Sequence, residues 1–209
     1  MTQKHQLTLY SFRRCPYAMR ARMALSYARL NYELREVDLK NKPEAMLMAS
    51  PKGTVPILMI DTNTIIDESL DVVSWVSKQT DHPLDYDINQ DEWVLKLHDA
   101  FVPTMHRYKY PERYPDVDQS ENLTLINTFL SDLDNWLGQQ GNHLNPWIEI
   151  ALFPLIRQLW IIEDGWQHQA IPHVSQWVDA TAHSDAFQRV MHKYDVWKPT
   201  DEPTIISNQ

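Results

Sequence analysis

The order of strand-like and helix-like segments is the feature that most constrains this chain. Over roughly the first 80 residues, short apolar runs typical of strands alternate with segments of helical pattern, and two of the runs are joined by a tight polar turn. The expected elements are strand 7–12, helix 16–30, strand 32–39, a short helix 41–49, strands 55–60 and 64–67, and helix 69–79. A strand–helix–strand unit followed by a hairpin and a covering helix predicts a mixed four-stranded sheet.

The remainder of the chain has a helical pattern. The segment TDHPLDYDIN, residues 80–89, is short and polar and is expected to link two domains. After it we expect helices at 90–108, with a bend at Pro103, and at 119–139, 146–166, 172–182 and 185–194. The helix from residue 146 is the most apolar, so it should be the buried centre of the second domain. The prediction is an α/β domain over 1–79, a linker over 80–89 and an all-helical domain over 90–209, whose tail from Pro199 is loosely ordered.

Composition limits the classes of function. The 209 residues carry a net charge of −9, which disfavours a nucleic-acid partner. The sequence has no apolar run of the roughly 20 residues that cross a bilayer, and its start does not resemble a signal peptide. A single cysteine cannot form an internal disulfide, so a cytoplasmic protein is expected. The nine histidines form no recognisable metal motif, and no metal is expected.

The single cysteine, Cys15, lies where the first strand meets the first helix, in the segment RRCPYA. Free backbone N–H groups and the positive end of the helix dipole should favour its thiolate and lower its pKa. Ala18 occupies the position of a second thiol in a C-x-x-C motif, so an outside thiol must resolve any mixed disulfide, and glutathione is abundant in the cytosol. The alternative is a buried structural cysteine without reactivity.

Four short motifs occur in order over residues 7–80: CPYA, NKPE, TVPIL and DES. Together they resemble the cytosolic glutathione transferases, most closely the cysteine-type omega class. The second half is similar mainly in its helical pattern and in the segment EIALFPLIRQ. The resemblance implies a thioredoxin-like α/β first domain, an all-α second domain, glutathione as co-substrate and a homodimer.

The resemblance also implies a set of site residues. Cys15 matches the catalytic cysteine of the family, and the positions that match its glutathione-binding residues are Tyr17, Leu39, Lys42, Val55, Pro56, Glu68 and Ser69. Tyr17 would line the site, Leu39 and Lys42 would lie beside the glycine end, and Val55 would offer its backbone to the cysteinyl part before a cis Pro56. Glu68 and Ser69 would hold the γ-glutamyl end.

The residue chemistry agrees with this assignment but leaves alternatives open. Lys42 can pair with one carboxylate of glutathione, Glu68 with its ammonium group, and the helix start at Ser69 with the second carboxylate. Each residue also has a simpler interpretation. Lys42 and Glu68 could be surface charges, Ser69 only a helix cap, and Pro56 an ordinary trans proline.

Other candidate residues have weaker support. Tyr10 and Ser11 end the first strand, near the position where hydroxyl-type transferases carry their activating group. The predicted central helix departs from the family pattern, because Pro146 stands at the usual cap position and Asn145 should cap instead. Three residues of the second domain could line a substrate cleft, although core packing is the alternative for the last of them: Tyr108, Arg157 and Trp160.

Three functions remain open on the sequence alone. The leading one is a glutathione-dependent thiol transferase or reductase, acting through a mixed disulfide of Cys15 with glutathione on glutathione adducts or dehydroascorbate. The second is classical conjugation of electrophiles to glutathione. The third is a non-catalytic interaction or stress protein of the same architecture.

Overall fold

The computed structural model describes residues 7–141, 144–162 and 170–208. The chain divides into two compact units. Unit 1 comprises Met1–Asp85 together with Asp185–Gln209, and unit 2 comprises Tyr86–Ser184. The boundary at Asp85 falls inside the polar segment 80–89.

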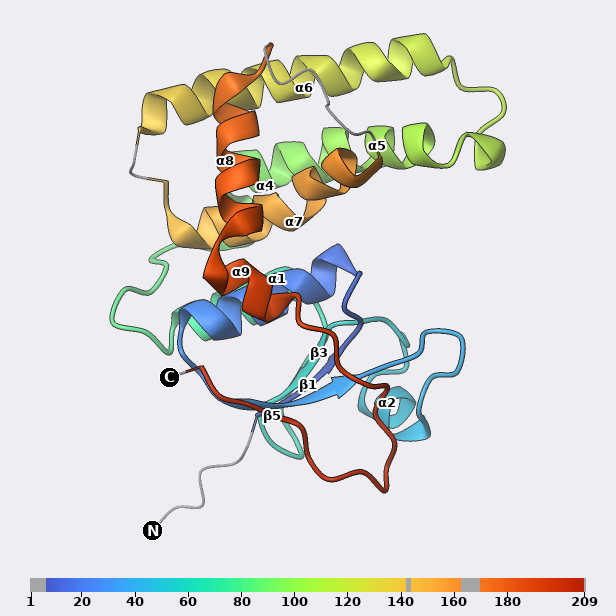
Figure 1. Cartoon of the computed structure of the whole chain (residues 1–209), viewed down its shortest axis with the longest axis vertical. Helices are drawn as coiled ribbons and strands as arrows, with labels where there is room; N and C mark the ends of the chain where they lie inside the picture. Colours follow the sequence, from blue (N-terminus) through green and yellow to red (C-terminus); the bar gives the residue numbers. More distant parts are fainter. Residues whose placement is uncertain (1–6, 142–143, 163–169, 209) are drawn as a thin grey trace. The chain divides into compact units, whose positions relative to one another are not determined.

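Unit 1 is built on a mixed sheet covered by helices (Figure 1). Its elements are β1 (Leu7–Ser11), α1 (Pro16–Tyr27), β2 (Tyr32–Glu36), α2 (Glu44–Ala49), β3 (Ile57–Met59), β4 (Ile65–Ile66), α3 (Ser69–Ser77), α9 (Asp185–Val190) and β5 (Ile205–Ile206). The strand order is β4-β3-β1-β2-β5, and β1 pairs parallel with β2 while the other pairs are antiparallel. Helix α1 packs against α3 and α9. The predicted thioredoxin-like order of the first seven elements is confirmed.

Local chemistry explains where α1 begins and ends. Pro16 is the first helical residue, where its missing N–H costs nothing and its fixed φ suits the helix. At the other end Arg29 adopts a φ of 54°, the left-handed conformation that ends many helices. The N–H of Leu30 then bonds the carbonyl of Leu25 at 3.0 Å. The helix is therefore shorter than the predicted 16–30.

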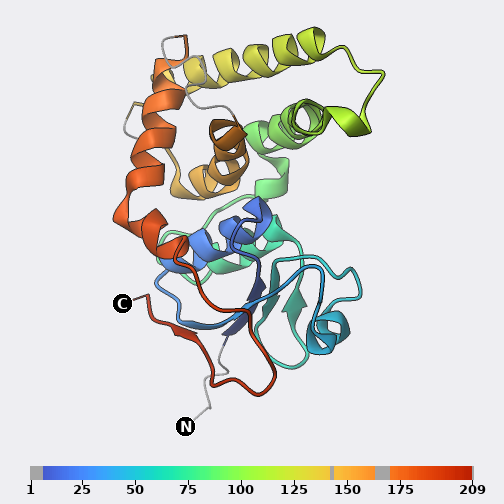
Figure 2. The same ribbon diagram turned by 45° about the vertical axis from the view of Figure 1, so that its right-hand side comes forward.

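The C-terminal segment corrects two predictions. The tail was expected to be loosely ordered, but Ile205 and Ile206 form β5 and pair with β2. Figures 1 and 2 show this red segment beside the strand to which it pairs. Residues 185–209 therefore belong to unit 1, and the predicted all-helical domain over 90–209 extends too far. A strand of two residues has no readable periodicity; it is stable because the edge of β2 offers it hydrogen-bonding partners.

Unit 2 is helical. Its elements are η1 (Ile88–Gln90), α4 (Glu92–Lys96), η2 (Leu97–Phe101), α5 (Val102–Lys109), η3 (Pro111–Arg113), α6 (Gln119–Gln140), α7 (Pro146–Ile162) and α8 (Pro172–His183). A π-helical turn, η2, lies between α4 and α5 directly before Pro103, the position where a bend is predicted. Proline cannot donate the usual backbone bond, and the wider turn accommodates its missing N–H.

Helix α7 has the buried position that its apolar sequence predicts. Ten of its residues are buried, from Trp147 to Leu159, and the helix packs against α4, α5 and α8. Its predicted residues beyond Ile162 lie outside the described part of the chain. Asn145 caps the helix as predicted, because its Oδ1 accepts a bond from the Trp147 N–H at 2.9 Å.

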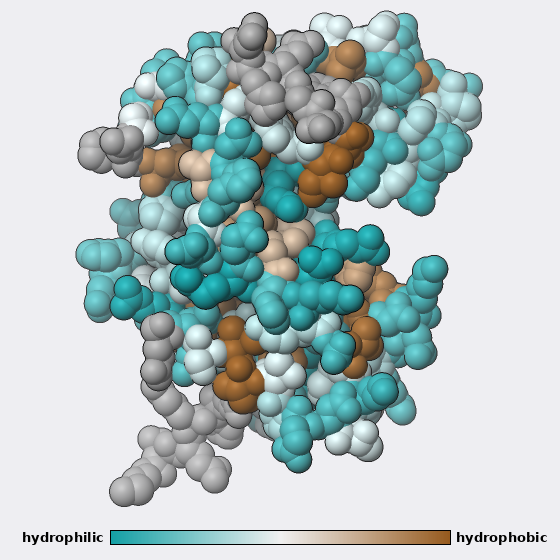
Figure 3. Space-filling view, in the orientation of Figure 1, coloured by the Kyte–Doolittle hydropathy of each residue, from teal (hydrophilic) through white to brown (hydrophobic). Residues whose placement is uncertain are grey.

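The molecular face drawn in Figure 3 is mostly hydrophilic, with smaller hydrophobic areas between the hydrophilic ones. Among the described residues, no helix combines the length and apolar character needed to span a bilayer.

Candidate active site

Cys15 stands at the start of α1. It is the residue immediately before the helix, with extended φ and ψ of −75° and 121°, and its N–H bonds the carbonyl of Phe12 at 2.9 Å. This bond closes the turn that carries the thiol out of β1. Its side chain is partly buried, and Sγ lies 3.7 Å from the backbone oxygen of Val55. The local fold thus brings together two residues that are 40 positions apart.

The pKa of the Cys15 thiol is raised, which contradicts the prediction of a lowered value. Burial is the largest influence and raises the pKa. The backbone N–H groups of Ala18 and Tyr17 and the charges of Arg22 and Arg20 all act to lower it, as expected for a helix start. Their combined effect is smaller than the cost of charging a sulfur atom removed from water. Sequence position revealed the favourable groups but not the depth of burial.

The peptide bond between Val55 and Pro56 is cis, as predicted. Val55 and Cys15 belong to the same apolar cluster, whose other members include Val37, Met46 and Ile57. This cluster joins the ends of β1 and β2 to α2 and β3. It therefore sets the position of the Val55 carbonyl beside the thiol.

Ser69 begins α3 and is tied to a buried arginine. Its Oγ accepts a hydrogen bond from Nη1 of Arg20 at 3.2 Å. Arg20 is fully buried in α1, and this burial lowers its pKa to about 10, although Tyr17 and Cys15 oppose the shift. Arg20 thus connects the start of α3 to the surroundings of the thiol. Helical spacing does not reveal this contact, because Arg20 and Ser69 are 49 positions apart in the sequence.

Glu68 lies in a small group of charges that the sequence analysis did not anticipate. Lys52 Nζ lies 2.6 Å from Glu68 Oε1 and 2.9 Å from Asp67 Oδ1. Ser50 Oγ donates to Asp67 Oδ2 at 2.6 Å. These bonds raise the pKa of Lys52 to about 12 and hold the pKa of Asp67 below its usual range. The sequence feature that could have indicated this charge group is the S-P-K-G turn before Val55, because it carries the lysine that pairs with the acidic residues of the DES segment.

The remaining predicted glutathione-binding residues, Lys42, Tyr17 and Leu39, are exposed or partly buried. Lys42 is exposed, and its Nζ would lie 3.4 Å from a Cβ placed on Gly53, in the turn that leads to Val55. Gly53 has a φ of 61°, so this close approach occurs at a position that favours glycine. Tyr17 is partly buried, with the guanidinium of Arg20 5.6 Å from its ring centre. Leu39 is 37% exposed in the loop after β2.

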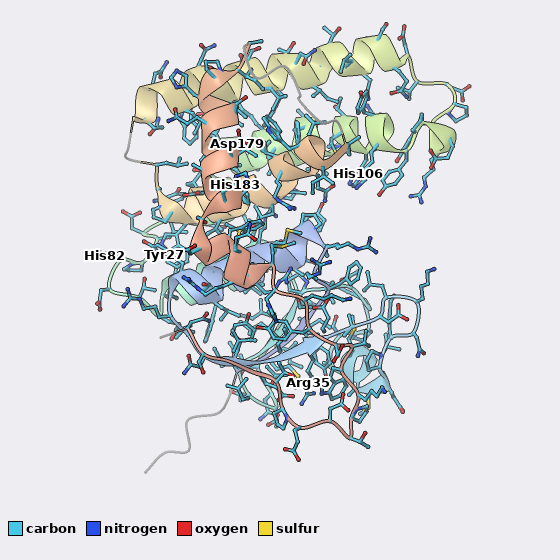
Figure 4. All side chains as sticks on the ribbon, in the orientation of Figure 1. Tyr27, Arg35, His82, His106, Asp179 and His183 are labelled. Atoms are coloured by element: carbon cyan, nitrogen blue, oxygen red, sulfur yellow. The ribbon has the colours of Figure 1, made fainter. Side chains whose placement is uncertain are left out.

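The two alternative hydroxyls are unsuited to activate a bound thiol. Tyr10 is 1% exposed, and its hydroxyl accepts a bond from Nη1 of Arg35 at 2.6 Å. Arg35, labelled in Figure 4, also stacks on the Trp197 ring at 4.5 Å. Ser11 is completely buried. Both hydroxyls belong to the interior of unit 1.

The three predicted cleft residues belong to unit 2. Tyr108 is on α5, Arg157 and Trp160 are on α7, and all three are partly buried. Helices α5 and α7 pack against each other. A role for these residues toward a co-substrate stays a prediction. In the described ranges, no three histidine, cysteine or acidic side chains gather as a metal site would require.

Comparison with known proteins links this geometry to one family. Residues 9–83 match the N-terminal domain of glutathione S-transferases. The chain is 37% identical over 65 residues to glutathione S-transferase omega-1 of Mus musculus, a match covering 31% of this chain and 27% of the mouse protein. It is 30% identical over 158 residues to glutathione S-transferase DHAR3, chloroplastic, of Arabidopsis thaliana, which covers 76% of this chain and 60% of that protein.

The fold similarity extends over nearly the whole chain. Glutathione transferase Omega 3C from Trametes versicolor superposes with a TM-score of 0.72 at 22% identity, covering 91% of each chain. At this identity the similarity shows the fold alone. The predicted combination of a thioredoxin-like unit with a helical unit is thereby confirmed.

Proposed function

We propose that the chain is a member of the glutathione S-transferase family and a glutathione-dependent thiol transferase that acts through Cys15, because residues 9–83 match the N-terminal domain of that family and the chain is similar to an omega-type member. The sequence matches cover only about a quarter to three fifths of the length of the mouse and Arabidopsis relatives, so activity, substrate and partners all belong to this proposal. We also propose that the protein is a homodimer located in the cytoplasm.

One observation carries the proposal: the single sulfur of the chain that can form a disulfide lies at a helix start, 3.7 Å from the carbonyl of Val55. The backbone N–H groups of Tyr17 and Ala18 act on this sulfur and favour its charged form. Thiol–disulfide exchange requires a thiolate that can reach a second sulfur. An extended tripeptide bound along the Val55 backbone, as an added strand, would bring its own sulfur to Cys15.

The proposed binding mode uses the charges around the start of α3. Glu68 would pair with the ammonium of glutathione, and the free N–H groups at Ser69 would bind the adjacent carboxylate. Lys42 would pair with the carboxylate at the glycine end. Lys52 Nζ already lies 2.6 Å from Glu68 Oε1, so the ammonium of glutathione would share the Glu68 carboxylate with it. Lys52 would keep its ion pair with Asp67.

The reaction has two balanced exchange steps. The Cys15 thiolate attacks the glutathionyl sulfur of an adduct R–S–SG, which forms the mixed disulfide of Cys15 with glutathione and releases RS⁻; this thiolate then takes a proton. A second glutathione, as its thiolate, attacks the glutathionyl sulfur of the mixed disulfide, releasing oxidised glutathione and the Cys15 thiolate. In the net reaction, R–S–SG and one glutathione give RSH and oxidised glutathione: the R–S sulfur is reduced to a thiol, and the one glutathione that is oxidised leaves paired with the glutathionyl unit of the adduct.

The raised pKa of Cys15 favours a second candidate, conjugation of electrophiles. A neutral Cys15 thiol could donate a hydrogen bond to the thiolate of bound glutathione, which would then be the nucleophile. A serine hydroxyl could replace the thiol in this role. The two candidates therefore differ in whether the reaction needs the sulfur of Cys15.

An activity panel separates them. Wild type, Cys15→Ser and Cys15→Ala are assayed with glutathione and a glutathionylated peptide, dehydroascorbate, a glutathionyl-quinol or an aryl halide. Thiol transfer predicts that both variants lose turnover of the peptide by about a thousandfold, with the mixed disulfide of wild type visible by mass spectrometry.

If Cys15→Ser retains peptide turnover, the thiol mechanism is wrong. Aryl halide turnover that survives in Cys15→Ser supports conjugation. If glutathione fails to bind in calorimetry at millimolar concentration, a non-catalytic protein is favoured instead.

A further inference from the structure

Two buried charged side chains hold the turn that presents Cys15. Glu36 Oε1 accepts a hydrogen bond from the backbone N–H of Arg13 at 2.5 Å. Arg22 Nη2 donates to the backbone oxygen of the same residue at 2.6 Å. Glu36 is 7% and Arg22 2% exposed. Both backbone polar groups of the residue two positions before the thiol are thus bound by charged groups almost out of contact with water.

The two side chains also carry opposite charges that act on each other. Burial lowers the pKa of Arg22, and the charge of Glu36 opposes that shift. Burial raises the pKa of Glu36, against the Arg13 N–H and the charge of Arg22. Hydrogen bonds from charged groups are stronger than neutral ones, and they are strongest where water is excluded. The other titratable or charged groups that act on Arg22 or line a cavity of about 550 Å³ with it are, among the described residues, Tyr32, Cys15, Arg13, Asp185, Arg189, His192 and Tyr194.

The same residues connect the turn to the C-terminal segment of unit 1. Arg22 Nη1 donates to the backbone oxygen of Val190, the last residue of α9, at 2.9 Å. The N–H of Trp197 bonds the backbone oxygen of Glu36 at 2.8 Å. The turn before Cys15 is therefore fastened to α1, to the end of β2 and to a segment some 170 residues later.

We infer that Arg22 and Glu36 are positioning residues that hold the Arg13 turn so that the Cys15 sulfur stays at the start of α1 beside Val55. The inference rests on the proposed role of Cys15. Loss of Arg22 would remove two backbone hydrogen bonds together with one positive charge near the thiol. Loss of Glu36 would leave the Arg13 N–H without its acceptor and Arg22 without its facing charge.

The test is alkylation of Cys15 by iodoacetamide across a range of pH, measured on the full chain. Cys15 is the only thiol, so the signal needs no correction for other sites. Arg22→Met should lower the rate at neutral pH about tenfold and move the titration midpoint to higher pH. Arg22→Lys keeps the charge but not the forked donor, so its rate should be intermediate. In Glu36→Leu the alkylation rate should fall about tenfold. Glu36→Gln keeps an acceptor for the Arg13 N–H, so it should retain most of the wild-type rate.

Arg189→Met is the matched control, because Arg189 is exposed and lines the same cavity as Arg22. It should alkylate at the wild-type rate, and circular dichroism checks that each variant is folded. If Arg22→Met and Glu36→Leu are folded and titrate like wild type, the inference is overturned.

Should either of these variants fail to fold, the comparison of Arg22→Lys with wild type decides, and an unchanged rate and pH profile overturns the inference. Alkylation needs no glutathione. The expected pattern without any glutathione-dependent turnover would therefore contradict the proposed function and support the positioning role.

Discussion

Unit 1 contains two helix starts with an acidic group close by, and the pKa of that group is raised at one of them and lowered at the other. At the start of α1 the Cys15 thiol is withdrawn from water, and its pKa is raised despite two N–H groups and two arginines. At the start of α3, Glu68 is exposed, and Asp67 beside it has a lowered pKa, mainly because Ser50 and Lys52 bond to it. A helix start favours negative charge in both places, but access to water and direct hydrogen bonds decide the outcome.

Arg20 connects the two helix starts, and its replacement should have the largest effect. Arg20→Met removes the bond to Ser69 and one of the positive charges near Cys15. We expect catalytic efficiency with a glutathionylated peptide to fall by about 30-fold, and the free energy of unfolding to fall by about 2 kcal/mol. Steady-state kinetics and urea unfolding measure these changes. Arg14→Met, at an exposed arginine beside the same thiol, is the control; an equal loss there would mean that general charge, not the buried contact, matters.

Glu68→Gln tests the exposed helix start alone. The amide keeps the shape but cannot pair with the ammonium of glutathione, so KM for glutathione should rise about tenfold while kcat changes little. Glu121→Gln, an exposed carboxylate in the first turn of α6, serves as the control. An unchanged KM in Glu68→Gln would remove this residue from the proposed site.

The pH dependence of Cys15 tests the buried helix start. Its raised pKa means that the thiol is mostly protonated near neutral pH and ionises only as the pH rises. Alkylation of the ligand-free protein should therefore have its midpoint above that of the same chain unfolded in urea. A midpoint below that of the unfolded chain would mean that the helix dipole, and not burial, has the larger effect on the pKa of Cys15.

Asp67→Asn should have the smallest effect. The pKa of Asp67 is lower in the folded than in the unfolded chain, so the ionised carboxylate stabilises the fold above the unfolded pKa. This contribution disappears as the pH falls through the folded value. Because the side chain is near the surface, its loss should cost less than about 1 kcal/mol at pH 7 and nothing at strongly acidic pH. Urea unfolding at both pH values measures the difference, and an equal loss at both would exclude the charge as its cause.

Local patterns foretold a large part of the fold. The alternation of short apolar runs with helical segments predicted β1 to α3 in order, and the apolar character of residues 146–162 predicted a buried α7. The cap at Asn145 and the cis bond before Pro56 were also anticipated. Each of these features depends on residues close together in the chain, or on the family pattern around them.

Contacts between distant residues escaped this reasoning. Nothing near Ile205 indicates that it pairs with β2, and nothing near Arg22 indicates that its guanidinium binds Val190. The predicted direction of the Cys15 pKa shift was wrong for the same reason, because burial depends on every element packed around the sulfur.

The order of residues alone thus established the succession of helices and strands and placed a lone thiol at a helix start. Only the folded chain decided how deeply that thiol is buried, which arginines face it and which segment covers the edge of β2. The physical reason is that helix signals and caps act over a few neighbouring residues, whereas desolvation and buried charge depend on surroundings assembled from the whole unit.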